Sequence, residues 1–195
     1  MINYSVINKS KPKTLLFIHG LFSTSGYWLP YLKYFRDHRL LILNIDYSNM
    51  GFDAYVGAVN DIVATEAGGK LGAVISHSLG TLLSGRLPKD VCEASFEICP
   101  VYCAQRRNTD DFITEIERKM KGPMLRDEIW RLLGGVDSAL ANFDYAEQSA
   151  PGQVIYLPTE DPYFSYHIQT EAKVFHGDHF DILEAVIDIA KVLSE

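Results

Sequence analysis

One serine lies where a buried strand is expected to turn into a helix, in the segment Ser76-His77-Ser78-Leu79-Gly80. The apolar residues 71–75 predict a short strand, and the residues after Ser78 predict a helix. Such a sharp turn strains the serine backbone and needs small residues two positions to either side, as Ser76 and Gly80 are. Backbone N–H groups at the helix N-terminus favour developing negative charge. The pattern predicts that Ser78 is a nucleophile; the alternative is that it only caps the helix.

A serine hydroxyl becomes reactive when a base accepts its proton, usually a histidine oriented by a carboxylate. Asp161 follows an expected strand at 153–157, and His179 follows an expected strand at 172–175. The chain order serine, acid, histidine is diagnostic of one fold. We therefore predict that Ser78, Asp161 and His179 are catalytic.

Other polar residues near Asp161 and His179 have simpler interpretations. Glu160 is the alternative acid, His176 is expected at a strand edge, and Asp178 is expected to shape the turn before His179. These residue types would allow a metal site at His176, Asp178 and His179, but we predict none.

A nucleophilic serine also needs two backbone N–H groups that bind the oxyanion. One is expected from Leu79, directly after Ser78, and the other from Leu21, in the loop after the first strand. Gly20 allows a close approach of that loop, and His19 is expected to be a structural hydrogen-bonding residue.

Together these motifs resemble the α/β-hydrolase superfamily. The matches lie at 19–20, 76–80, 159–162 and 177–179, and they span almost the whole chain. The resemblance implies hydrolysis of an ester, thioester or related acyl compound through an acyl-enzyme, without a cofactor. Ser76 departs from the usual glycine, and the short chain is expected to lack part of the N-terminal hairpin and to carry a reduced lid. Dehalogenases and epoxide hydrolases of the superfamily resemble it less, because they carry aspartate where this chain has Ser78.

The order of apolar segments predicts one domain, residues 1–195, with a mostly parallel sheet and helices on both faces. Expected strands lie at 15–18, 39–45, 71–75, 94–98, 153–157 and 172–175. Expected helices lie at 27–35, 52–67, 79–87 and 180–193. Residues from about 104 to 150 are expected to form a lid of helices only, at 109–121, 124–133 and 138–146, separated by Gly122-Pro123 and Gly134-Gly135.

The expected lid is rich in basic residues. Residues 105–131 hold seven of the eighteen Lys and Arg residues and six acids. One interpretation is a solvated helix face with ion pairs. The other is a docking surface for an anionic partner such as an acyl carrier protein or coenzyme A. The candidate residues of that surface are Arg106, Arg107, Arg118, Arg126 and Trp130. Pimeloyl-acyl-carrier-protein methyl ester esterases of biotin synthesis are small lidded hydrolases similar to this chain.

Composition limits the remaining possibilities. The net charge of −7 disfavours nucleic acid as a partner. The first thirteen residues lack the apolar region of a signal peptide, and no apolar run approaches the length of a membrane span. The three cysteines are expected to be reduced thiols, not a metal site. We predict a cytoplasmic enzyme without cofactor or metal that acts on a small-molecule or carrier-linked carboxylic ester. The sequence leaves its oligomeric state open, with a monomer favoured. A thioesterase, a lyase or acyltransferase, and a non-catalytic binding protein are the alternatives.

Overall fold

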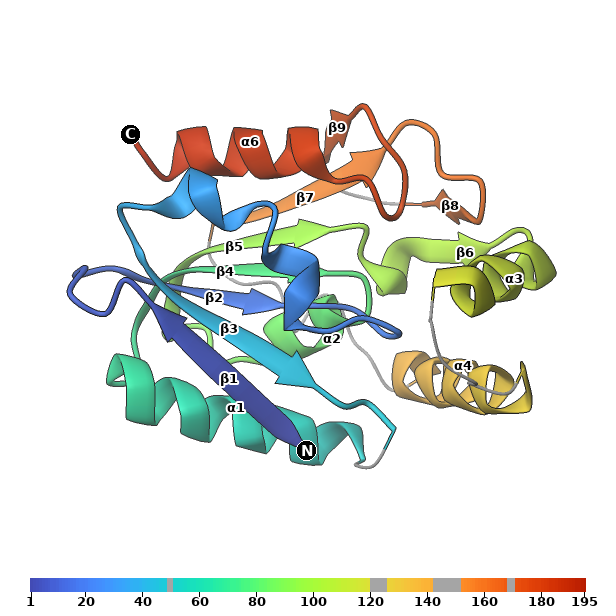
Figure 1. Cartoon of the computed structure of the whole chain (residues 1–195), viewed down its shortest axis with the longest axis horizontal. Coiled ribbons are helices and arrows are strands. Elements are labelled where there is room, and N and C mark those ends of the chain that lie inside the picture. Colours follow the sequence, from blue (N-terminus) through green and yellow to red (C-terminus); the bar gives the residue numbers. More distant parts are fainter. Residues whose placement is uncertain (49–50, 120–125, 142–151, 168–170) are drawn as a thin grey trace.

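The computed structural model describes residues 1–48, 51–119, 126–141, 152–167 and 171–195. Within these ranges a seven-stranded sheet runs through the molecule (Figure 1). In spatial order its strands are β1 (Ile2–Ile7), β3 (Arg39–Ile45), β2 (Thr14–Ile18), β4 (Leu71–His77), β5 (Cys92–Ile98), β7 (Gln153–Pro158) and β9 (Lys173–Phe175). Neighbouring strands are parallel except β1, which pairs with β3 in the antiparallel direction. The mostly parallel sheet predicted from the sequence is confirmed.

Helices cover both faces of the sheet because successive side chains of each strand point to opposite sides. Phe17 belongs to the core cluster under α6 (Leu183–Val192), whereas Ile18 belongs to the cluster under α1 (Phe52–Ala67). The short α2 (Gly80–Ser84) follows β4 directly. A continuous apolar sequence such as that of β2 therefore fills two cores at once.

Three predicted helices outside the lid differ from the structure. The helix expected at 79–87 is the shorter α2, which ends at Ser84. The segment 27–35 forms two 3-10 helices, η1 (Ser25–Trp28) and η2 (Leu32–Phe35), instead of one α-helix. Between them the backbone makes hydrogen bonds of the 3-10 type, from residue i to residue i−3, such as Tyr31 N–H to the Trp28 carbonyl at 2.9 Å. Pro30 has no N–H with which to continue an α-helix. The last helix begins at Leu183 instead of residue 180, because the Asp178 carboxylate accepts the N–H groups of Phe180 and Asp181 and holds a turn, as expected for Asp178.

The lid does not consist of helices only. It begins with β6 (Ala104–Arg106), which pairs in the antiparallel direction with β8 (Phe164–Tyr166). The helices α3 (Thr109–Lys119) and α4 (Arg126–Ala141) follow, and in Figure 1 they lie beyond the ends of the strands to which the arrowheads point.

The predicted break at Gly134-Gly135 is wrong, because α4 runs through both glycines. The helix accepts the propensity cost of about 1 kcal/mol per glycine because apolar neighbours such as Leu132 and Leu133 are buried. The predicted helix ends at 120–121, 124–125 and 142–146 lie outside the described residues.

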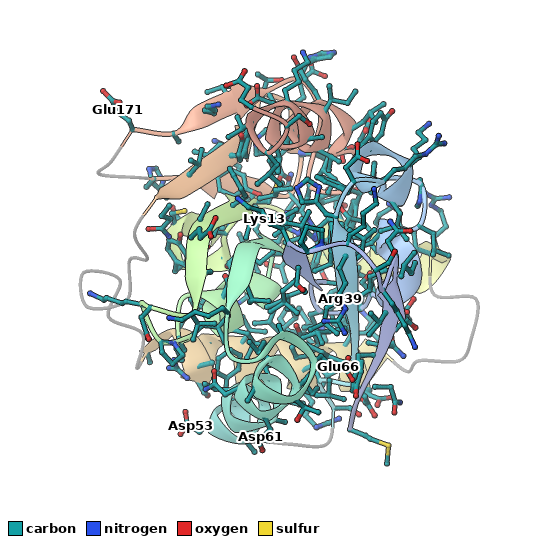
Figure 2. The ribbon with its side chains drawn as sticks, turned by 90° about the vertical axis from the view of Figure 1, so that its left-hand side faces the viewer. Lys13, Arg39, Asp53, Asp61, Glu66 and Glu171 are labelled. Carbon is teal, nitrogen blue, oxygen red and sulfur yellow. The ribbon has the colours of Figure 1, made fainter. Side chains whose placement is uncertain are left out.

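At the end of the molecule opposite the lid, an ion pair joins a strand to a helix. Figure 2 views this end, and Arg39 of β3 and Glu66 of α1 are labelled there. Their side chains are 2.7 Å apart and are 16% and 22% exposed. The pair ties α1 to the edge of the sheet that β1 covers, a strand that the sequence analysis did not predict. Among the described residues, the structure has no helix long and apolar enough to cross a membrane.

Candidate active site

Ser78 lies in the turn between β4 and α2 with a backbone φ of 52°. This left-handed conformation is strained for a residue other than glycine, and it persists only when the surroundings enforce it. A Cβ at Gly80 would lie 2.7 Å from the Ile18 carbonyl oxygen, and a Cβ at Gly20 would lie 2.7 Å from Ser78 Cβ. Both positions therefore need glycine for the turn to pack against the end of β2.

Ser76, which stands where such turns usually have glycine, has a polar neighbourhood of its own. Its Oγ lies 2.8 Å from Ser84 Oγ, which hydrogen-bonds the buried Glu97 carboxyl group at 3.2 Å. Burial raises the pKa of Glu97 to about 7, although hydrogen bonds from Tyr102, Gln153 and Ser84 act in the opposite direction. The serine side chain thus joins a buried polar network behind the turn and leaves the turn itself unobstructed.

The structure brings the three predicted catalytic side chains together. His179 Nε2 lies 3.0 Å from Ser78 Oγ, and His179 Nδ1 lies 3.5 Å from Asp161 Oδ2. The side chains of His179 and Asp161 are 4% and 2% exposed. Glu160 does not take part: its side chain is 69% exposed and lies 3.6 Å from His176.

A fourth residue, Tyr166 of β8, lies between the acid and the histidine. Its hydroxyl donates to Asp161 Oδ2 at 2.6 Å and lies 3.1 Å from His179 Nδ1. These distances connect His179 to Asp161 more closely through Tyr166 than directly. No local pattern in the sequence indicates Tyr166, because its position depends on the pairing of β8 with β6, about sixty residues away in the chain.

The protons of this network follow from its charges. Burial acts to raise the pKa of Asp161, but the hydrogen bonds and charge of His179, with hydrogen bonds from Tyr166 and Tyr163, lower it below its usual value. Burial first, then Cys99 and Asp161, raises the pKa of Tyr166 far above its usual value. The Tyr166 hydroxyl thus stays protonated and donates a hydrogen bond to the Asp161 carboxylate. Its oxygen then accepts a hydrogen bond from His179 Nδ1–H. This leaves His179 Nε2 as an acceptor for the Ser78 hydroxyl.

Two further histidines hold the backbone around this network. His77 Nε2 donates to the carbonyl oxygen of His179 at 2.8 Å, and its ring stacks on Tyr27 with centroids 4.8 Å apart. His19 Nε2 accepts the N–H of Ile45 at 2.9 Å, so its Nδ1 carries the proton that it donates to the Gly20 carbonyl. Burial lowers the pKa of both rings, which favours neutral imidazoles. His19 is thus a structural hydrogen-bonding residue, as the sequence suggested.

A cavity of about 810 Å³ opens above Ser78 and His179. Leu21 and Leu79, the expected oxyanion-binding residues, both line it. Most of its walls are apolar, with α3 and α4 of the lid forming one side. Bulky apolar side chains dominate this lid side: Phe112, Ile116, Leu133, Val136 and Leu140.

The five predicted lid residues do not gather at the cavity. Arg106 lines it and pairs with Asp137, whereas Trp130 is 46% exposed on α4 and does not line it. Arg118 pairs with Glu115, and Arg126 pairs with two acids of α3. Arg107, at the end of β6, donates its backbone N–H to the Tyr163 carbonyl and does not line the cavity.

One group of residues has the atom types of a metal site. Single ligand atoms of His77, Cys99 and His179 lie within 4.8 Å of one another, and all three residues are buried. Metal binding would need the Cys99 thiolate, but burial raises the pKa of this thiol well above its usual value. Both ring nitrogens of His179 also have hydrogen-bond partners, Ser78 and Tyr166. The arrangement therefore fits a hydrogen-bonded network better than a metal site.

Comparisons with known proteins agree with this geometry. A sequence model described as the alpha/beta hydrolase family matches residues 15–188, which is most of the chain. The chain belongs to the alpha/beta hydrolase family. No curated protein matches its sequence.

Solved structures of alpha/beta hydrolases share the fold at low sequence identity. The monoacylglycerol lipase of Paleococcus ferrophilus has a TM-score of 0.68 at 13% identity, and the alignment covers 99% of this chain and 98% of that one. An esterase from Rhodococcus sp. ECU1013 has a TM-score of 0.70 at 15% identity over 100% and 94% of the chains. A thioesterase domain from the curacin biosynthetic pathway has a TM-score of 0.64 at 10% identity over 100% and 95%. At these identities the likeness establishes the fold.

Proposed function

We propose that this alpha/beta hydrolase family member is a serine hydrolase that cleaves carboxylic esters through an acyl-enzyme. The observation that carries the proposal is the 3.0 Å contact of Ser78 Oγ with His179 Nε2 at the floor of a large apolar cavity. A histidine whose Nε2 faces the serine hydroxyl and can accept its proton is the base that a serine nucleophile requires.

The proposed reaction has two steps, acylation of Ser78 and hydrolysis of the acyl-enzyme, and the same groups act in both. Ser78 Oγ attacks the ester carbonyl carbon while its proton moves to His179 Nε2, and N–H groups of Leu21 and Leu79 bind the resulting oxyanion. The C–O bond of the ester then breaks, and the alcohol leaves with the proton from His179. A water molecule attacks the acyl-enzyme in the same way, releasing the carboxylic acid and restoring Ser78.

Tyr166 and Asp161 are proposed to stabilise the histidine while it is charged. Asp161 supplies the negative charge, and the Tyr166 hydroxyl carries its effect to Nδ1 through bonds of 2.6 and 3.1 Å. Because both side chains are largely screened from water, the attraction is stronger than on the surface.

Thioester hydrolysis is the second candidate, because the same steps apply and the apolar cavity suits an acyl chain. A carrier-protein methyl ester of biotin synthesis is a narrower form of the main proposal. The side chains of Arg118 and Arg126 are 71% and 42% exposed, although each already pairs with an acid. On that form of the proposal, Arg118→Glu slows hydrolysis of the carrier-linked ester and leaves a small ester unaffected. Equal loss with both substrates, or with neither, would contradict it.

The proposal is tested by the intact mass of the protein after brief exposure to a fluorophosphonate, with turnover of short p-nitrophenyl esters measured in parallel. We expect one adduct on the unaltered protein and on Ser5→Ala, whose serine is exposed on β1, and none on Ser78→Ala. A folded protein without an adduct would contradict the proposal. An adduct with no ester turnover would favour a lyase or acyltransferase, and a protein with neither would favour a non-catalytic binding protein.

A further inference from the structure

Among the residues that the structure describes, three side chains with a full charge line the cavity, Arg106, Lys119 and Asp137. Arg106 of β6 and Asp137 of α4 neutralise one another, since one guanidinium nitrogen contacts both carboxylate oxygens. Lys119 therefore gives the described part of the cavity walls a net positive charge, in a chain whose own net charge is −7.

Lys119 belongs to the face of α3 that forms the cavity wall. Phe112, Ile116 and Lys119 are spaced by four and three residues, so they share one side of the helix, and all three line the cavity. The Lys119 ammonium lies 3.6 Å from the centre of the Phe180 ring. The Phe180 ring in turn lies 5.3 Å from the ring of His179. The positive charge is thus held one aromatic ring away from the proposed base.

The acid beside Lys119 neutralises it only partly. Glu115 Oε1 lies 3.5 Å from the Lys119 ammonium, but Arg118 binds both oxygens of this carboxylate at 2.6 and 2.8 Å. The Lys119 side chain is 38% exposed, and the separation from Glu115 is long for an ion pair. Such a pair contributes little free energy, so an anion inside the cavity can compete for the ammonium.

The charged groups lie at opposite ends of the cavity roof. Arg106 precedes the first turn of α3, and Lys119 is the last residue of the helix. An α-helix of this length rises about 15 Å between its ends. Between them α3 contributes Thr109, Phe112 and Ile116 to the cavity wall, and the Phe112 ring lies 6.3 Å from the His179 ring.

We infer that the substrate is an ester with a second, negatively charged group such as a carboxylate, which Lys119 binds while the apolar part contacts Phe112 and Ile116. The inference rests on the proposed function of the same cavity. A positive charge in an apolar cavity attracts anions and raises their local concentration. It also gives a carboxylate a charge-assisted hydrogen bond that a neutral ester of equal size lacks.

The test is a binding measurement that needs no turnover. Ser78→Ala protein is titrated calorimetrically with the monomethyl and the dimethyl ester of octanedioic acid, which have the same chain but differ by one carboxylate. We expect the monomethyl ester to bind about fivefold more tightly, in the range of a partly exposed ion pair. Lys119→Met in the same background should abolish the difference, and Lys119→Arg should keep it. The matched control is Lys33→Met, whose ammonium lies 5.0 Å from the Tyr34 ring and does not line the cavity.

The inference is overturned if the two esters bind equally, if neither binds at millimolar concentration, or if the preference survives Lys119→Met. Thermal unfolding of each variant identifies a loss of folding. The fluorophosphonate experiment distinguishes failure of this inference from failure of the proposed function. Labelling of Ser78 without an anion preference defeats only the inference, and a preference lost with Lys119 but without labelling defeats only the hydrolase proposal.

Discussion

The two sides of the cavity are held in place by different forces. The floor, formed by the turn at Ser78 and the loops after β7 and β9, consists of buried groups with short hydrogen bonds. The roof, formed by α3 and α4, has a small apolar cluster with Phe112 and Ile129 and a set of exposed ion pairs. The floor is over-determined by packing, whereas much of the roof depends on contacts that water and salt weaken.

Because of this difference, we expect the floor to carry out the reaction and the roof to determine which substrates bind. Reacting groups need a geometry fixed to a fraction of an ångström, which buried networks provide. A roof held by weak pairs can change its side chains at little cost in stability, so we expect substitutions there to alter which substrates the cavity accepts. Lys119 and Arg106 belong to this changeable side, and Ser78 and His179 to the fixed one.

The largest effect is expected from removing the base in the floor. His179→Gln should lower kcat/KM for a p-nitrophenyl ester by about 10⁴-fold, because the serine loses its proton acceptor. His176→Gln is the matched control, since His176 lies three residues earlier and its side chain is 78% exposed. A loss below tenfold for His179→Gln, or equal losses in the two variants, would show that the floor does not perform the chemistry.

A large effect on stability is expected from Glu97, behind the floor. Its pKa of about 7 in the folded protein lies above the usual value of 4.5, so the folded state holds the proton to higher pH than the unfolded state. The stability that the raised pKa of Glu97 contributes is therefore fully present below about pH 4.5 and is lost as pH rises through about 7. Glu97→Gln should remove this pH dependence, and above pH 7 the variant should be more stable by up to about 3 kcal/mol.

Urea unfolding at pH 5 and pH 8 measures this effect. Glu160→Gln serves as the control, because the Glu160 side chain is 69% exposed, and it should leave the difference between the two pH values unchanged. If Glu97→Gln keeps the pH dependence of the unaltered protein, the buried carboxyl group is not its source.

Tyr166 tests whether the acid acts on the histidine through a hydroxyl group. Tyr166→Phe removes the 2.6 and 3.1 Å contacts and leaves Asp161 at 3.5 Å from His179. We expect kcat to fall by about 10- to 100-fold, the worth of one hydrogen bond to a charged group, with KM unchanged. Tyr163→Phe changes the tyrosine directly before β8 and should keep kcat. A rise in KM with constant kcat would instead assign Tyr166 to substrate binding.

The same contrast explains how much the sequence predicted. Ser78 directly follows β4, and Asp161 and His179 lie a few residues after the ends of β7 and β9, so a local pattern was enough to predict that they meet. Tyr166 joins them only through the pairing of two three-residue strands, a contact too distant in the chain for periodicity to reveal. The strand β1 was missed although Ile2, Tyr4 and Val6 alternate with polar residues, a pattern typical of a strand with one covered face, and Ile2 and Val6 pack against the core. Gly134 and Gly135 suggested a break in the roof, but packing around Leu133 keeps the helix continuous.

The smallest effect is expected in the roof, at Arg126. Its guanidinium joins α4 to α3 through Asp110 at 2.6 Å and Glu117 at 3.3 Å, with a side chain that is 42% exposed. Arg126→Met should lower the free energy of unfolding by less than about 1 kcal/mol at low salt, and this loss should disappear at high salt. Arg131→Met, which removes only a 3.8 Å contact with Glu128 on the same helix, should have a smaller effect. Urea unfolding at the two salt concentrations measures both losses. A loss at Arg126 that persists in high salt would mean that the roof is fixed as firmly as the floor, and selectivity would then have to arise from the floor as well.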